Sequence, residues 1–97
     1  MIIRIVRMHF REDSVEKFLT IFNKHKVAIR NVEGCTHLEL LKDINHANIF
    51  TTLRHWGKPG DLEAYRNSAL FKDVWAQVKP LFSESPHAFS LEKFTSK

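Results

Sequence analysis

The chain has 97 residues, of which 43% are hydrophobic, 11% aromatic and 27% charged, so we expect a single domain over residues 1–97. This composition excludes a disordered, collagen-like or low-complexity chain, and one cysteine excludes a disulfide framework. Fifteen lysines and arginines against eleven acidic residues give a net charge of +4, and because no block of like charges forms, we expect no nucleic-acid partner.

Residues 2–10 are rich in β-branched side chains and predict a first strand. Apolar residues occupy both alternating sets, so both faces of this strand are expected to be covered. One set contains Ile3 and Ile5; the other contains Ile2, Val6, Met8 and Phe10. Charged residues interrupt the segment, whereas a secretory signal needs about 7–15 uninterrupted apolar residues and a membrane span about 18. We expect a cytoplasmic protein with no membrane segment.

The next segment predicts a long amphipathic helix over residues 14–32. The sequence Asp13-Ser14-Val15-Glu16 has the form of a capping box, and Gly34 is typical of a helix end. The apolar residues at helical spacing are Val15, Phe18, Leu19, Phe22 and Ile29.

Residues 36–42 and 47–56 have the length and composition of two strands. Residues 43–46 separate them with Asp and Asn, which suit a short turn, so the two strands are expected to pair antiparallel. Residues 59–61 open a second helix, in which Ser68 caps a second segment after a break and Pro80 ends or kinks the helix. Residues 88–94 predict a final strand.

The order of these elements is β-α-β-β-α-β. It predicts an α+β, ferredoxin-like fold, in which a four-stranded antiparallel sheet carries both helices on one face. The other face then has no cover within the chain. The strands nevertheless offer more hydrophobic side chains than one helix-covered face can use, among them Ile3, Ile5, Leu53 and the aromatic residues of the last strand. Burial of this face against a second copy predicts a homodimer.

Several common sites are excluded by their spacing requirements. An RNA-recognition motif needs glycine and aromatic positions that residues 47–56 lack, and the first strand has no ring before Phe10. The three glycines, Gly34, Gly57 and Gly60, fit neither phosphate-binding loop. RNA and nucleotide binding are therefore not predicted.

Histidine and cysteine also fail to form a recognisable centre. His37 and Glu39 share a strand face, but two ligands are not a site, and neither zinc-hydrolase nor zinc-deaminase signatures occur. Cys35 stands about 7 Å from His37 along an extended strand, too far for direct proton transfer. We expect no metal and a packed, inert Cys35.

Aromatic side chains are concentrated at the end of the third strand and along the second helix. Trp56, Tyr65, Phe71 and Trp75 can line a flat pocket for a planar substrate, with Arg54 on the same strand face as Trp56. The alternative is plain packing, because large rings also fill the core of a small domain.

At this point the chain resembles the antibiotic biosynthesis monooxygenase family of dimeric α+β barrels. The likeness rests on the capped first helix before Gly34-Cys35, Leu38 and Leu40, the strand ending at Trp56, and Leu62, Tyr65, Ser68 and Phe71 on a broken helix. The resemblance implies a homodimer whose sheets pack back to back, with a small pocket in each subunit. It also implies oxygenation of quinol-like or polycyclic aromatic substrates by O2, with no metal, flavin or haem.

Several positions depart from the family pattern. Many members have Glu where this chain has Arg54, and His where it has Tyr65 and Leu70; Trp56 carries over directly. Haem-degrading relatives place an axial His at the position of Trp75, and because Trp cannot ligate iron, haem degradation is not expected.

The resemblance and the spacing together predict a cofactor-independent monooxygenase acting on a small quinol-like or polycyclic aromatic compound. In this hypothesis Arg54 stabilises a substrate anion, Trp56 stacks on the substrate or donates to it, and Tyr65 orients an oxygen, while Phe71 and Trp75 complete the binding pocket. The alternative is a non-catalytic dimeric protein of the same fold that binds a small ligand.

Overall fold

The computed structural model describes residues 1–95 and confirms the predicted order of elements. The second predicted helix forms as two helices, and short 3₁₀ turns precede α1 and follow α3. The elements are β1 (Ile2–His9), η1 (Glu12–Ser14), α1 (Val15–Arg30), β2 (Cys35–Lys42), β3 (Ile49–Trp56), α2 (Pro59–Arg66), α3 (Ala69–Val78), η2 (Lys79–Leu81) and β4 (His87–Leu91). No helix in residues 1–95 is both long and apolar enough to cross a bilayer.

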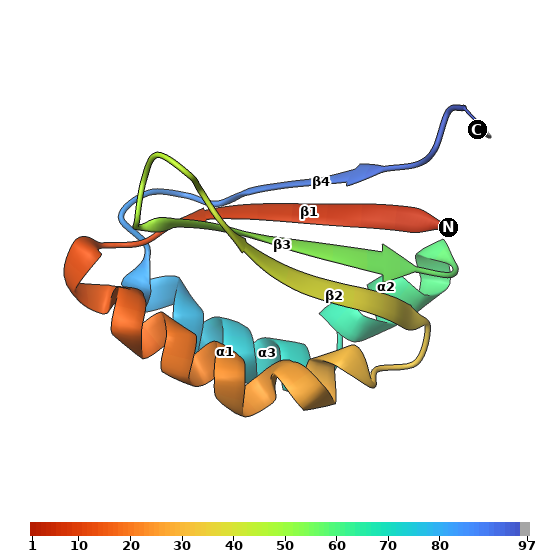
Figure 1. The fold of residues 1–97 in the computed structure, drawn as a ribbon. Helices are drawn as coiled ribbons and strands as arrows, with labels where there is room; N and C mark the ends of the chain where they lie inside the picture. The colour runs from red at the N-terminus through yellow and green to blue at the C-terminus, as the bar shows by residue number, and fades with distance from the viewer. Residues whose placement is uncertain (96–97) are drawn as a thin grey trace.

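The four strands form one antiparallel sheet in the order β2-β3-β1-β4, as the ferredoxin-like prediction required. The register places Arg4 opposite Arg54 and Ile5 opposite Leu53. Figure 1 shows α1 and α3 side by side under one face of the sheet, with α2 near the end of β3, while none of the helices in the described part of the chain lies over the other face. We call the first the covered face and the second the open face.

Two apolar clusters fill the space between the covered face and the helices. The first centres on Phe10, which is fully buried and stacks on Phe18 of α1 with ring centroids 4.1 Å apart. The second contains Ile29, Cys35, Trp56 and Tyr65. The pocket described below is bordered by residues of both clusters, including Phe18 of the first and Tyr65 of the second.

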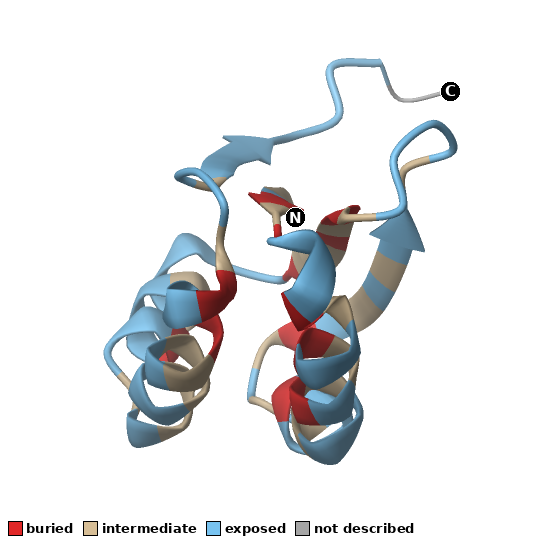
Figure 2. Ribbon diagram, turned by 90° about the vertical axis from the view of Figure 1, so that its left-hand side faces the viewer, coloured by how far each residue is buried: buried red, intermediate tan, exposed pale blue. Residues whose placement is uncertain are grey.

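Within residues 1–95, no helix covers the apolar side chains of the open face. Ile3, Ile5 and Leu53 of β1 and β3 are half-buried, whereas Phe89 and Leu91 of β4 remain 46% and 50% exposed. All five belong to one alternating set, which points away from the helices. Figure 2 shows that β4 is exposed along its whole length.

Several details differ from the sequence predictions. The capping box predicted at Asp13-Ser14-Val15-Glu16 does not form, because residues 12–14 make a 3₁₀ turn and α1 begins one residue later, with Ser14 at its N-cap. The Ser14 hydroxyl donates to Asp13 Oδ1 and accepts from Arg11. The last strand ends at Leu91, so Phe94 lies beyond it and is fully exposed.

The predicted Ser68 cap is confirmed, since its Oγ accepts from the Phe71 N–H at 3.1 Å.

The hairpin between β2 and β3 is longer than predicted, with a connection over residues 43–48. The Asp43 carboxylate accepts from the N–H groups of Asn45 and His46 at 2.9 and 3.0 Å. The Asn45 N–H is the largest cause that lowers the pKa of Asp43, and the His46 N–H and the Arg7 charge act in the same direction. Asp43 thus organises this turn, as its composition indicated.

Gly34 is the position where the turn after α1 demands glycine. Its φ is +87°, and a Cβ there would collide with the side chain of Asp61 at the start of α2. We expect Gly34→Ala to lower the free energy of unfolding by about 1–3 kcal/mol, measured by urea denaturation. Gly60→Ala is the matched control: a Cβ at Gly60 meets nothing within 4 Å, so stability should hold or rise. Equal losses in both variants would contradict this explanation.

Candidate functional site

A cavity of about 360 Å³ lies between the covered face and the helices, a size typical of small-molecule sites. Residues of β1 and β3 line the cavity on the side of the sheet, and residues of α1, α2 and α3 line it on the side of the helices. Pro86 and Ala88 line it next to β4. Most of its wall is apolar, including Phe18 and Ile21 of α1. The fold thus provides a largely apolar site between the sheet and the helices.

Aromatic rings form a connected row along this cavity. Tyr65 meets Phe71 edge to face with ring centroids 5.3 Å apart, and Phe71 stacks on Trp75 at 5.8 Å with an interplanar angle of 10°. All three rings line the cavity. They present faces and edges suited to a planar aromatic ligand.

Three arginines line the same cavity: Arg4 of β1, Arg54 of β3 and Arg66 of α2. The Arg54 guanidinium carbon lies 5.1 Å from the centroid of the Tyr65 ring, a cation–π distance. Arg54 Nε is buried and has no hydrogen-bond partner within residues 1–95. Among the described residues, no aspartate, glutamate, histidine or cysteine lines the cavity.

The positive charges are close enough to affect one another. Burial is the largest cause that lowers the pKa of Arg4, and the charges of Arg66 and then Arg54 lower it further. Arg4 and Arg54 are also directly opposite on neighbouring strands, where like charges destabilise a sheet. Arg4 donates to the Ser90 hydroxyl at 3.0 Å, which is a neutral partner. An anion in the cavity would relieve this repulsion.

Trp56 lies outside the wall of the cavity. Its side chain is fully buried in the second apolar cluster and packs behind Tyr65, with ring centroids 5.4 Å apart. Its indole Nε1 is buried with no hydrogen-bond partner in the described part of the chain. Of the five residues predicted for the site, the structure therefore brings Arg54, Tyr65, Phe71 and Trp75 together around the cavity, whereas Trp56 contacts it through Tyr65.

Arg4 and Arg66 line the cavity but were not predicted from the sequence. Arg4 alternates with Val6 and Met8 along β1, so the sequence places a charged side chain on the same face as these apolar residues. A charge on the face that packs against the helices could have identified Arg4 as a site residue. His25 of α1 was not predicted either, and its Nε2 is buried without a partner within residues 1–95. His25 lies four residues from both Ile21 and Ile29, which line the cavity, but it is not itself a wall residue.

The other predicted polar residues lie away from the cavity. Cys35 is buried as predicted, and its thiol donates to the His37 carbonyl oxygen at 3.4 Å. His37 Nε2 lies 2.6 Å from Glu39 Oε1, on the face predicted for both residues. This pair is part of β2, and neither residue lines the cavity.

Comparison with known proteins places this geometry in context. Residues 1–77 match the model of the family described as antibiotic biosynthesis monooxygenase. None of the proteins with curated functions matches the sequence.

Solved structures show the same fold at low sequence identity. A conserved protein from Methanosarcina mazei Go1 superposes with a TM-score of 0.89 and 19% identity, over 96% of this chain and 93% of the other. A Mycobacterium tuberculosis protein gives 0.89 and 17%, over 98% and 96%. A protein described as an antibiotic biosynthesis monooxygenase gives 0.91 and 12%, over 98% and 100%. At these identities the likeness extends to the fold.

Proposed function

The chain belongs to the antibiotic biosynthesis monooxygenase family, and from this premise we propose that it is a cofactor-independent monooxygenase that oxidises a small quinol-like or polycyclic aromatic substrate with O2. The observation that carries the proposal is the cavity, whose wall combines the aromatic row with three arginines and, within residues 1–95, no acidic residue. Arg66 pairs with Glu63 at 3.7 Å, so Arg4 and Arg54 are the arginines of the wall that lack an acidic partner among the described residues. Such a site selects a flat apolar body that carries negative charge.

The substrate binds as an anion. The wall offers no carboxylate, imidazole or thiol among residues 1–95, so the cavity holds no strong base. Arginines beside a phenol or enol favour its ionised form and lower its pKa. The protein thus promotes ionisation through charge, and Arg54, with its unpaired buried Nε, is the group that we assign to the anionic oxygen.

The reaction then needs only O2. An ionised phenolic polycycle transfers one electron to O2, the two radicals combine at the ring carbon, and the resulting peroxide loses water. For a methylene carbon the balance is CH2 + O2 → C=O + H2O: one oxygen atom enters the substrate and the other leaves as water. The chain's residues hold the ring, exclude water and stabilise negative charge.

Individual roles follow from position. Tyr65, which lines the cavity beside Arg54, orients the substrate oxygen, while Phe71 and Trp75 hold the ring. Trp56 acts as a positioning residue, because it packs behind Tyr65 and does not reach the cavity. This assignment replaces the stacking role that the sequence suggested for Trp56.

The proposal includes a homodimer formed through the open face. The apolar side chains of that face, above all on β1, β3 and β4, have no cover within residues 1–95, and a second copy presents the same surface to them. A cytoplasmic location, drawn from the N-terminal sequence, stays a prediction.

Oxygen consumption tests the activity directly. We expect metal-free protein, prepared with a chelator, to accelerate O2 uptake by an anthrone or hydroquinone, with one O2 consumed per substrate molecule. An oxygen electrode measures the uptake, and added catalase should return no O2 because the second oxygen atom leaves as water. Tight binding of these compounds, seen as quenching of tryptophan fluorescence, without O2 uptake would instead support the non-catalytic binding protein.

A further inference from the structure

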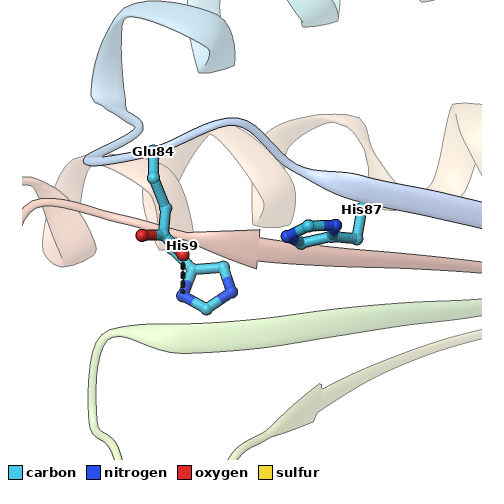
Figure 3. Close-up of side chains that lie close together, drawn as sticks. All are labelled: His9, Glu84 and His87. Atoms are coloured by element: carbon cyan, nitrogen blue, oxygen red, sulfur yellow. Dashed lines mark ion pairs between the residues drawn. The ribbon is translucent and has the colours of Figure 1, made fainter.

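A second group of residues lies on the open face, away from the cavity. His9 ends β1, His87 begins β4, and Glu84 belongs to the segment that leads into β4. Each offers one ligand atom, and these atoms all lie within 4.8 Å of one another. Figure 3 shows the three side chains on neighbouring segments, with His9 Nδ1 paired to Glu84 Oε1 at 3.1 Å. The two imidazole rings are 6.1 Å apart at their centroids and nearly perpendicular.

We propose that His9, Glu84 and His87 form a site for a divalent transition metal ion, with Zn²⁺ as the ion that best fits the ligands. Two imidazoles and one carboxylate are a set that Zn²⁺ accepts, leaving one position for water or an outside ligand. A tetrahedral zinc ion brings its ligand atoms to about 3.4 Å from one another. Glu84 and His87 are both exposed, so their side chains have room to rotate toward this spacing.

The backbone around the site is held in place on both sides of Glu84. Ser83 N–H donates to the His9 carbonyl oxygen at 2.8 Å, and Ser83 Oγ donates to the same oxygen at 3.2 Å. On the other side, His87 is paired with Arg7 in the β1–β4 ladder. The ligands are thus brought together by the fold, so an ion does not need to organise the chain.

One charge opposes the ion. Arg7 Nε donates to His9 Nε2 at 3.4 Å, and its positive charge weakens the binding of a dication. Asp43 pairs with Arg7 at 3.8 Å and offsets part of this charge. Removing the charge of Arg7 should therefore strengthen metal binding, which is an effect that damage to the fold would not produce.

The site is separate from the proposed oxygenation. His9 and His87 belong to the open face, whereas their neighbours Met8 and Ala88 line the cavity on the covered face. Both Glu84 and His87 also lie outside residues 1–77, the part matched by the family. An ion here would tie β4, the exposed edge strand that closes the cavity, to β1.

Calorimetric titration of metal-free, full-length protein with ZnCl2 tests the site. We expect about one Zn²⁺ per chain, affinity lowered at least about tenfold in His87→Ala and Glu84→Gln, and affinity raised in Arg7→Gln. His46→Ala, which removes an exposed histidine from the loop between β2 and β3, is the matched control and should bind as the wild type does.

Cobalt gives an independent readout, since the visible absorption of Co²⁺ reports its coordination geometry. Wild-type protein should produce tetrahedral-type bands that His87→Ala loses. The proposal fails if the wild type does not bind Zn²⁺, or if His87→Ala and His46→Ala bind equally, which would indicate adventitious surface binding. Either outcome leaves the oxygenation proposal intact, because that activity is measured with metal-free protein.

Discussion

Replacing Arg54 with methionine is expected to lower kcat/KM for an anionic aromatic substrate by about 10- to 100-fold without lowering stability. The loss follows from the charged hydrogen bond to the substrate oxygen, worth about 1.5–3 kcal/mol. Stability should hold or rise, because Arg54 faces Arg4 across the β1–β3 ladder and methionine removes that repulsion while keeping an unbranched side chain. Steady-state O2 uptake and thermal unfolding measure the two effects.

Two controls separate the charge of Arg54 from its volume and from the net charge of the protein. Arg54→Lys keeps the charge but not the planar fork, so it should recover part of the lost rate. Arg11→Met removes an exposed arginine that pairs with Asp13 outside the cavity, and it should leave kcat/KM unchanged. If Arg54→Met loses stability in parallel with activity, Arg54 is a structural residue and the anion assignment fails.

Much of the fold was predictable because local patterns and global arrangement agree. The capping serine Ser68, the breaking Pro80 and the period of α1 each act within a few residues, and all are visible in the sequence. The capping box at Asp13 failed for a physical reason. A 3₁₀ turn uses the same residues and directs the Ser14 hydroxyl to Asp13 instead of to the helix backbone.

The candidate site was only partly predictable from the sequence. Alternation along a strand predicts on which face of the sheet a side chain lies, but not whether that side chain reaches the cavity or is buried behind another residue. Arg54 and Trp56 share the covered face, yet one lines the cavity and the other is sealed behind Tyr65. The pairing of Arg4 with Arg54 depends on the register between β1 and β3, two strands that are distant in the sequence and have no hairpin turn to fix which residues pair. The cluster of His9 and His87 depends on the same register and on the approach of β4 to β1.

A single charge in the centre of the open face should separate the proposed homodimer. Leu53 of β3 lies opposite Ile5 of β1, and Ile5 lies opposite Phe89 of β4, so these side chains form a continuous apolar strip across three strands. We expect Leu53→Asp to raise the dimer dissociation constant more than 100-fold, since an unpaired buried carboxylate costs several kcal/mol. Sedimentation velocity at micromolar concentration should show a wild-type dimer and a mutant monomer.

The control for this variant is Ile44→Asp, which adds the same charge to a side chain that is 94% exposed in the loop between β2 and β3. It should remain dimeric, because that position lies outside the strip. Leu53→Thr keeps strand propensity and tests whether a mild loss of apolar area weakens the dimer without unfolding the chain. A wild-type monomer, or a dimer that survives Leu53→Asp, would mean that the open face has another role. Dissociation with unchanged circular dichroism would show that each chain folds around its own helix-covered core and that the second core forms only on association.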